Sequence, residues 1–353
     1  MLRQQDVGHR IVVRRIVGIR EGRTLFSDAL GELVELSETH ITLATDAGPL
    51  RVPVAEVHRA KRVPPARRPT AAAVVALELA ADEAWPAPVR GRLGDWRLRW
   101  ADGWTGRANS ALPVGDPDRP LPAALDAVQR WYAERGGTAL VNTPLPLAAP
   151  VGAELDARGW TARPPVLVQT VPLRALAAPP DAGLADTPPD ADTPTAGPDG
   201  PPPLAGPDGP PPLAGPDGTP PVTLAGAPAD DWLAIAAGRK GGLPDAARHV
   251  LTAVDRVRFA ELRIDGRLLA VGRGTVTGEG RWLGVSLLEV LPEARRRGFA
   301  VAVVRALARW GADEGATRAF LQVEQSNTGA VELYRRLGFT THHTYLTRVA
   351  PAA

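Results

Sequence analysis

The alternation of apolar and polar positions divides the chain into regions with different predicted structures. Residues 8–62 hold short apolar runs separated by turn residues, at Arg10–Val17, Leu33–Leu36, Ile41–Ala44 and Leu50–Val57. Short strands at this spacing are typical of a small antiparallel barrel. We therefore expect an all-β domain over residues 1–66, with a boundary in the proline- and arginine-rich segment 63–69.

A low-complexity stretch from Ala175 to Val222 separates the two larger regions. It contains a nine-residue repeat whose copies begin at Ala196, Ala205 and Ala214. The Pro-Asp-Gly steps favour turns and the proline triplets favour polyproline II, so this stretch cannot build a buried core. We expect a semi-rigid tether over residues 175–222, with a ligand for a proline-binding module as the alternative.

Residues 223–349 show strands alternating with helices. Arg281–Leu291 is predicted to be a buried strand, and the apolar positions after it have helical spacing, at Val303, Val304, Leu307 and Trp310. Ala319–Glu324 predicts a second strand and Thr328–Leu337 a second helix. Gly338 is expected to end that helix as its C′ glycine.

Residues 72–174 resemble a copy of this last region. Three short matches share one offset of 179 residues: Arg130-Trp131 with Arg309-Trp310, Leu112-Pro113 with Leu291-Pro292, and Gly159-Trp160 with Gly338-Phe339. A common register is hard to attribute to composition alone. We infer a tandem duplication, with copies at 72–174 and 223–349.

Composition limits the chemistry. The chain has no cysteine, which excludes disulfides, thiolate metal sites and a cysteine nucleophile, and its six histidines show no metal-ligand spacing. Lys61 and Lys240 are the only lysines among 41 basic residues, against 39 acidic ones. This arginine bias, with abundant Ala, Pro and Gly, is typical of GC-rich actinobacterial coding, so it does not indicate nucleic-acid binding. Without a membrane-spanning run or a signal peptide, we expect a cytoplasmic protein.

A basic loop with a central glycine, Glu293–Ala300, joins the predicted strand to its helix. A helix start offers free backbone N–H groups and the positive end of the dipole, which together bind anions. Arg295, Arg296 and Arg297 lie where that dipole disfavours cations, unless a bound pyrophosphate reverses the sign. We interpret the loop as an anion site, with a solvated basic turn as the alternative.

The second predicted helix carries a polar stripe. Ser326 or Asn327 can cap its start. Asn327, Ala330 and Tyr334 fall on one side, while the leucines at 333 and 337 form another stripe. Asn327 and Tyr334 can therefore face one ligand while the leucines face the core; the alternative for Tyr334 is a core aromatic.

Two motifs in this order resemble those of the GNAT superfamily of N-acetyltransferases: Arg295-x-x-Gly298-x-Ala300 after Leu288–Pro292, and Asn327-x-x-Ala330-x-x-x-Tyr334 before Gly338-Phe339. The resemblance covers residues 223–349. It implies the α+β GNAT acyl-CoA N-acyltransferase fold, here in tandem, with acetyl-CoA as co-substrate and no metal. With an SH3-like barrel over 1–66, the whole chain is similar to an actinobacterial group assigned as N-acetylglutamate synthases or histone-type protein acetyltransferases.

The resemblance implies a role for each matched position. Backbone groups of Leu288 and Val290 would pair with the pantetheine arm, and the Val290 N–H would polarise the thioester carbonyl. The pyrophosphate would be held by Arg295, Arg296, Arg297, Gly298, Phe299 and Ala300. Asn327 would bind the pantetheine side, and Tyr334 would be the general acid for the departing thiolate.

Direct attack of an amine on the thioester requires that the amine lose a proton. Glu289 and Glu324 lie on the two flanking strands, and either could be the base, a substrate-orienting group or a structural carboxylate. Three functions stay open: acetylation of a small amine such as the glutamate α-amine, acetylation of a protein recruited by the barrel, and non-catalytic acetyl-CoA sensing. The intact motif argues against the third.

The first copy departs from the motif at each diagnostic position: Asp116 replaces Arg295, Arg119 replaces Gly298, Leu121 replaces Ala300 and Leu155 replaces Tyr334. An acidic residue and a lost glycine should defeat pyrophosphate binding. We predict that residues 72–174 are catalytically inactive and complete the acceptor site or stabilise the fold. Core packing is the first expectation for Trp96, Trp100 and Trp104, and a binding wall the second.

Overall fold

The computed structural model describes residues 2–20, 23–45, 48–63, 69–177, 221–238 and 243–351. These residues form two compact units, Met1–Arg68 and Pro69–Ala353. Most of the predicted linker 175–222 lies outside the described residues. Its first three residues end the short helix α4 (Leu173–Ala177), and Val222 begins a strand, so its edges belong to the folded unit.

The amino-terminal unit is a five-stranded antiparallel sheet in the order β4-β3-β2-β1-β5. Its elements are η1 (Gln4–Asp6), β1 (Arg10–Arg20), β2 (Arg23–Leu36), β3 (His40–Thr45), β4 (Gly48–Pro53), η2 (Val54–Glu56) and β5 (Val57–Arg62). One face forms a small core, which includes Ile11, Val13, Leu33, Leu43 and Val52. The unit is all-β, as expected. The closed SH3-like barrel is not confirmed, because the described residues leave β4 and β5 as the two edges of an open sheet.

The apolar run Leu50–Val57 does not form a single strand. Pro53 ends β4, and the N–H of Val54 turns away to the carbonyl of Thr39, 2.9 Å away. The chain then passes through η2 and returns as β5, which pairs with β1. The polar sequence of β5 lacks the alternation that would have revealed it, because only one row of its side chains contacts the core.

The larger unit contains a nine-stranded sheet in the order β11-β12-β13-β14-β15-β10-β16-β8, with β9 beside β16. Its strands are β8 (Leu140–Leu145), β9 (Thr161–Ala162), β10 (Val166–Pro172), β11 (Val222–Ala225), β12 (Val257–Ile264), β13 (Arg267–Thr277), β14 (Trp282–Val290), β15 (Arg318–Glu324) and β16 (Thr340–Val349). A separate hairpin joins β6 (Val89–Leu93) to β7 (Trp96–Trp100). The helices are α1 (Ala71–Ala84), α2 (Leu121–Ala133), α3 (Ala149–Ala157), α5 (Asp230–Ala237), α6 (Asp245–Thr252), α7 (Phe299–Asp313) and α8 (Thr328–Arg336), with 3₁₀ turns η3 (Arg107–Asn109) and η4 (Pro292–Ala294).

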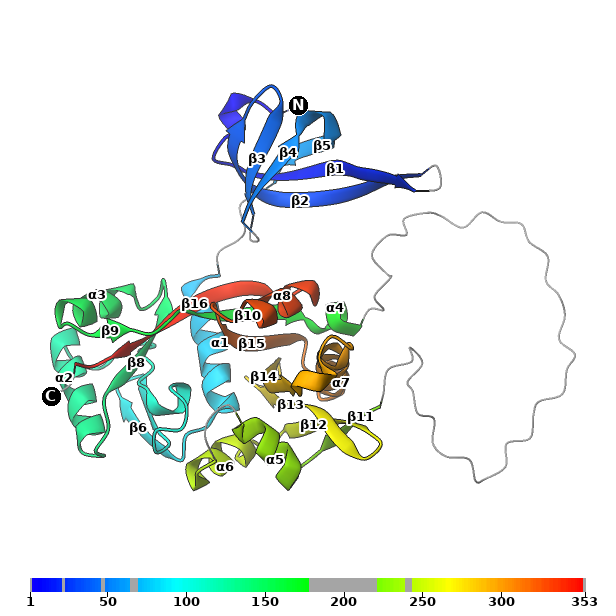
Figure 1. Ribbon diagram of the computed structural model, residues 1–353. Helices are drawn as coiled ribbons and strands as arrows, with labels where there is room; N and C mark the ends of the chain where they lie inside the picture. The colour runs from blue at the N-terminus through cyan, green and yellow to red at the C-terminus, as the bar shows by residue number, and fades with distance from the viewer. Residues whose placement is uncertain are drawn as a thin grey trace, which may run out of the picture. The chain divides into compact units, whose positions relative to one another are not determined.

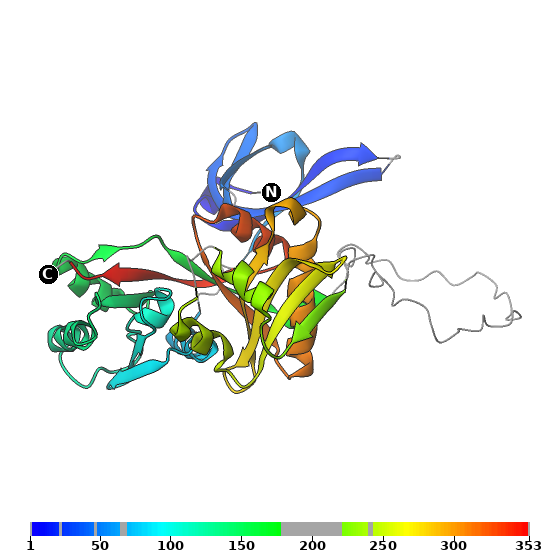
Figure 2. The same ribbon diagram turned by 60° about the horizontal axis from the view of Figure 1, so that its bottom comes forward.

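The two halves of this unit interleave their last strands (Figure 1). Strand β10 of the first half lies between β15 and β16 of the second, and β16 continues into the first half to pair with β8 and β9. Figure 2 shows β16 extending from one half into the other. The β10–β16 ladder pairs Val166 with Tyr345, which are themselves 179 residues apart. The same offset relates a pair of the β9–β16 ladder to a pair of the β10–β16 ladder: Thr161 pairs with Val349, and Thr340 and Thr170, each 179 positions away from one of these, pair with each other.

Helices also recur at this offset. The bounds of α3 and α8 differ by 179 residues at both ends. Each is followed by a glycine in the left-handed region, Gly159 with φ of 74° and Gly338 with φ of 84°. This symmetric pairing and spacing is what a duplication would leave. The insertion of β10 between β15 and β16 was not predicted, because nothing local in its sequence identifies its neighbours.

The sheet of the second half is covered on both faces. Helices α7 and α8 pack on one face around a cluster that includes Val303, Val304 and Leu307. On the other face, α1 of the first half packs its Leu77 and Ala80 against Trp282 and Phe320. The first half has a core of its own, with Trp96 and Trp160 buried in it.

A fully buried arginine ties α1 to the second half. Arg273, on β13, donates from Nη1 to the Ala84 carbonyl at the end of α1. It also donates to the carbonyls of Val250 and Leu251 at the end of α6, at 3.2 and 2.8 Å. Helix carboxyl ends carry partial negative charge, so they stabilise a buried cation. Burial nevertheless lowers the pKa of Arg273 to about 9.

Arg273→Met should destabilise the larger unit by about 3–5 kcal/mol, because it leaves three buried carbonyls without their donor. Denaturant unfolding followed by circular dichroism would measure this. Arg267→Met is the matched control on the same strand, since Arg267 forms only an exposed ion pair with Glu293 and its loss should cost less than about 1 kcal/mol. Equal effects of the two substitutions would contradict the role assigned to Arg273.

Candidate active site

Strands β14 and β15 are parallel and pair only over their first residues. The ladder joins Trp282–Gly284 to Arg318–Phe320. Beyond this point both strands continue, β14 to Val290 and β15 to Glu324, without pairing to each other. Backbone groups on the facing edges therefore need other partners, as main-chain groups away from water normally do. This separation is the central feature of the site.

A bulge at Leu287 determines which backbone groups of β14 face β15. Leu287 has φ of 52°. Past it, the N–H of Leu291 donates to the carbonyl of Leu269 on β13, at 2.9 Å. Because successive N–H groups of a strand point to opposite sides, the N–H groups of Val290 and Leu288 point away from β13, towards β15.

The same bulge reverses the side-chain faces of β14. Leu283 and Val285 face α7 before the bulge, whereas Leu288 and Val290 pack against that cluster after it. Glu289 lies opposite Val271 in the β13–β14 ladder. It therefore shares the other face of the sheet with the cluster that contains Val271, Trp85 and Trp104.

Glu324 lies on that other face as well. On β15, Ala319, Leu321 and Val323 pack towards α7, so the alternating positions Gln322 and Glu324 point the opposite way. Glu324 is exposed, whereas Glu289 is partly buried. The structure thus places both carboxylates on the face opposite α7, on the two strands that separate.

The basic loop has the predicted form. Arg296 and Gly298 are both left-handed, with φ of 62° and 80°, and Gly298 is the N-cap of α7. The first helical bond of α7 runs from the N–H of Ala302 to the carbonyl of Gly298, so the N–H groups from Phe299 to Val301 precede any acceptor of the helix. Arg295, Arg296 and Arg297 are exposed, while Phe299 is buried. Arg295 donates from Nε to the Val290 carbonyl, which links the loop to the end of β14.

Helix α8 brings its polar positions to the same side of the sheet. The side chain of Asn327 accepts from the N–H of Ala330 at 3.2 Å, so Asn327 rather than Ser326 is the cap. Tyr334 is 9% exposed and belongs to the cluster that includes Phe299 and borders Leu288 and Val290. Its ring contacts Phe339 with centroids 5.7 Å apart. The structure therefore brings Tyr334, the loop and the end of β14 together on one face, and Glu289 and Glu324 on the other.

The corresponding loop of the first half is occupied by its own carboxylates. Asp95 accepts from the N–H of Asp116 at 2.9 Å, and Asp116 accepts from the N–H of Asp118 at 2.8 Å. A Cβ on Gly115 would lie 2.5 Å from Asp95, so that glycine only makes room for this side chain. Three carboxylates at this position repel a further anion.

Sequence analysis missed a buried polar chain beneath α1. Glu78 accepts from His343 at Nε2, 2.7 Å away, and the Nδ1 atoms of His343 and His342 lie 2.9 Å apart. One of the two Nδ1 atoms carries the proton of the bond between the rings, and the Nε2 of His343 donates to Glu78. Burial, with the charges of His343 and Arg318, lowers the pKa of His342 to about 4, although Glu78 opposes this shift. Both histidines lie on β16, and Glu78 is 265 residues away from His343 in the sequence, so no local pattern connects them.

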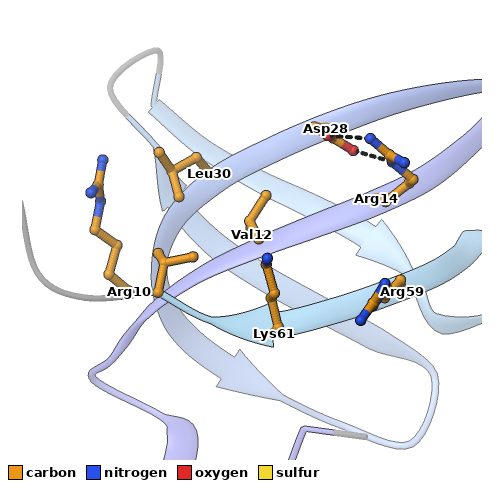
Figure 3. Close-up of a pocket in the computed structure, with 8 residues that line it drawn as sticks. Arg10, Val12, Arg14, Asp28, Leu30, Arg59 and Lys61 are labelled. Carbon is orange, nitrogen blue, oxygen red and sulfur yellow. Dashed lines mark hydrogen bonds and ion pairs between the residues drawn. The ribbon is translucent and has the colours of Figure 1, made fainter. Parts of the chain in front are cut away.

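A separate cavity of about 470 Å³ lies on the amino-terminal sheet (Figure 3). Its floor is formed by Val12, Leu30 and Val63, and its rim by Arg10, Arg14, Asp28, Arg59 and Lys61. Arg14 is paired with Asp28 at 2.8 Å. The remaining cations give this face a positive charge. None of the residues predicted to bind acetyl-CoA lines it.

The partly paired parallel strands, the left-handed glycine at the start of α7 and the capped helix α8 define an N-acetyltransferase of the GNAT class. The same fold occurs in a solved GCN5-related N-acetyltransferase from Kribbella flavida, with a TM-score of 0.54 and 17% identity, covering 82% of this chain and 98% of that one. The family model described as "Probable histone acetyltransferase Rv0428c C-terminal" matches residues 71–195 and 212–347, and the chain belongs to this family.

Two relatives extend the comparison. A protein of Mycobacterium tuberculosis described as "Probable histone acetyltransferase Rv0428c" is 30% identical over 281 residues, which are 77% of this chain and 72% of that protein. The "Uncharacterized N-acetyltransferase YobR" of Bacillus subtilis is 38% identical over 78 residues, 21% of this chain and 32% of that protein. Within the described ranges, no group of three or more His, Asp or Glu residues is placed to hold a metal ion. None of the helices there is long and apolar enough to cross a membrane.

The depressed pKa of His342 predicts a stability change in acid. Between about pH 6.5 and pH 4 the unfolded chain binds a proton at His342 that the folded chain does not, so the free energy of unfolding should fall as pH drops through this window. His342→Gln should reduce that slope, measured by urea unfolding at a series of pH values. His249→Gln, on the exposed side of α6, is the control and should leave the slope unchanged. An unaltered slope in His342→Gln would rule out this assignment.

Proposed function

We propose that the larger unit transfers the acetyl group of acetyl-CoA to a small primary amine, with the glutamate α-amine as one candidate. The proposal assigns catalysis to residues 223–349, joined by the linker 175–222 to an inactive copy at 72–174. The main support for this proposed function is the separation of β14 from β15 beyond Gly284 and Phe320. An extended amide chain inserted there would complete the unpaired strand edge, as an added β-strand does.

The residues present fit acetyl-CoA. The N–H groups of Leu288 and Val290 point into the separation and would hydrogen-bond the pantetheine arm. The loop supplies three exposed arginines and the free N–H groups of α7, which would hold the pyrophosphate, through Arg295, Arg296, Arg297, Gly298, Phe299 and Ala300. Asn327, at the exposed start of α8, would bind the pantetheine side.

The chemistry follows from the two faces of the sheet. Acetyl-CoA, when bound, supplies a thioester whose carbonyl carbon is attacked directly by the amine. The Val290 N–H would donate to the carbonyl oxygen, where negative charge develops. Tyr334, on the α7 side, would deliver its hydroxyl proton to the departing sulfur. Glu289 and Glu324, on the opposite side, would accept or relay the proton of the amine, so acceptor and co-substrate approach from different faces.

The basic cavity of the amino-terminal unit favours a second candidate function, acetylation of a protein recruited by that unit. Arg10, Arg59 and Lys61 surround an apolar floor and would attract an acidic segment with an apolar residue. The same charge would repel a basic tail. If the acceptor is a protein, this face would therefore bind an acidic part of it, away from the acetylated lysine.

Tyr334→Phe should lower kcat for CoA release about 100-fold, because it removes only the proposed acid, and should leave acetyl-CoA binding unchanged. The assay would compare both proteins across amino acids, polyamines and a basic peptide. Tyr132→Phe is the matched control, since Tyr132 is a buried tyrosine of the inactive half whose hydroxyl donates to the Arg99 carbonyl. Full activity of Tyr334→Phe would exclude Tyr334 as the acid.

Arg59→Ser combined with Lys61→Ser separates the two acceptor candidates. With a small amine, kcat/KM should be unchanged within about twofold, because the rim charges only steer charged macromolecules at a distance. A protein acceptor docked at this cavity should instead lose affinity, with a strong salt dependence in the wild type. Arg51→Ser serves as the control, because Arg51 lies on β4, at the opposite edge of the sheet, and does not line the cavity.

A further inference from the structure

The acceptor face of the sheet carries a second set of polar groups that the proposed chemistry does not use. These groups lie on the same face as Glu289 and Glu324, and they come from both halves. Their centre is Arg107 of the first half, at the start of η3. The inference below rests on the proposed acetyl transfer and concerns the chemical class of the acceptor.

Arg107 is held by a rigid segment. Asn109 makes four hydrogen bonds within that segment: its Nδ2 donates to the carbonyls of Trp104 and Thr105, and its Oδ1 accepts from the N–H groups of Ala101 and Gly103, all at 2.8–2.9 Å. The guanidinium of Arg107 lies 5.2 Å from the ring centroid of Trp85, and Trp85 is stacked on Trp104. The cation is therefore fixed in position before any ligand binds.

Arg107 reaches the strands that separate. It lies near the hydroxyl of Tyr345, where its charge partly offsets the rise that burial imposes on the pKa of that phenol. Tyr345 donates to Gln322 of β15 at 3.2 Å. Gln322 is two residues beyond Phe320, where the β14–β15 ladder ends. Arg107 is thus beside the opened part of β15, on the side that Glu324 shares.

Across the separation, Ser286 of β14 offers a second polar group. Ser286 lies opposite Arg273 in the β13–β14 ladder, so their side chains share the acceptor face. The Oγ of Ser286 is buried and has no hydrogen-bond partner, and the same holds for the Nε of Arg107. Buried polar atoms without partners are uncommon in folded proteins, and a polar ligand group bound on this face would supply partners for these two.

The positive charges on this face identify this ligand group as an anion. Arg107 forms no ion pair within the part of the chain that the structure describes. Its charge acts on the buried guanidinium of Arg273, because it contributes, after burial, to the lowering of the pKa of Arg273. Two guanidinium groups that influence each other and lack ion-pair partners repel, and a bound anion relieves that repulsion. A planar carboxylate matches the geometry of a guanidinium and accepts from a serine hydroxyl as well.

We propose that Arg107, assisted by Ser286, binds a carboxylate of the acceptor, so that the acceptor class is an amino acid rather than a simple amine or a lysine side chain. The carboxylate lies at Arg107 and the amino group points towards Glu289 and Glu324. The half that lost its own acetyl-CoA loop thereby supplies the specificity of the other half.

The test uses the full chain with matched acceptor pairs, each an amino acid and its amide, such as glutamate and isoglutamine or alanine and alaninamide. The wild type should prefer the free carboxylate by at least about tenfold in kcat/KM. Arg107→Gln should raise KM for the amino acid about 30-fold or more and abolish the preference, whereas Arg107→Lys should retain part of it. Ser286→Ala should raise KM without lowering stability, because its Oγ has no partner to lose.

Two controls keep the outcomes distinct. Arg119→Gln removes an exposed arginine of the same half and should change neither parameter. Acetyl-CoA binding, measured by calorimetry, should be equal in all variants. Equal use of acid and amide by the wild type, or an intact preference in Arg107→Gln, would overturn the proposed carboxylate site. Neither outcome would contradict the proposed acetyl transfer.

If no amine in the panel releases CoA, the proposed function fails and the carboxylate site is tested by binding. Glutamate would be titrated into the acetyl-CoA-loaded protein and followed by tryptophan fluorescence, since Trp85 lies against Arg107. A saturable signal that Arg107→Gln abolishes would support the site without catalysis. The absence of a signal in the wild type would exclude it.

Discussion

The β10–β16 ladder is the constraint on which the larger unit depends. Each half ends in a strand that pairs with the other half: β10 pairs with β15 and β16, and β16 pairs with β8 and β9. Neither half therefore has a complete sheet by itself: without β10, strands β15 and β16 lose their common neighbour. Removing the first half would therefore remove a central strand from the sheet of the second.

This arrangement also determines which half contributes residues to each face of the sheet. The residues proposed to hold acetyl-CoA all come from the second half, on the face covered by α7 and α8. The opposite face is covered by α1 and the segment 85–110 of the first half, together with α5 and α6 of the second. The loop of the first half is filled by Asp95, Asp116 and Asp118, so under the proposed function the first half contributes to the acceptor side and not to the binding of acetyl-CoA.

The sequence predicted the elements around the active-site loop almost to the residue, because each has a strong local signal. Helix α8 has a cap at Asn327 and a terminal Gly338, and β14 and β15 are rich in apolar residues. The pairing of strands and side chains with partners far away in the sequence had no such local signal. Arg273 and Arg107 look like any other residue of an arginine-rich chain, and the partners of β10 and His343 are more than 140 residues away. The open amino-terminal sheet differs from the expected barrel in the same way, since closure depends on which strand edges meet.

The charges of the acceptor face affect how the attacking amine loses its proton. An amine reaches the thioester as a nucleophile only when it is neutral, and a nearby cation lowers the pKa of an ammonium group. Arg107 and Arg273 place positive charge on this face, while Glu289 and Glu324 lie further along the separating strands. An acceptor bound through its own carboxylate neutralises part of that positive charge but keeps its amino group close to it. Under the proposed mechanism, deprotonation would then need no strong base, and an exposed carboxylate such as Glu324 would be sufficient to pass the proton to water.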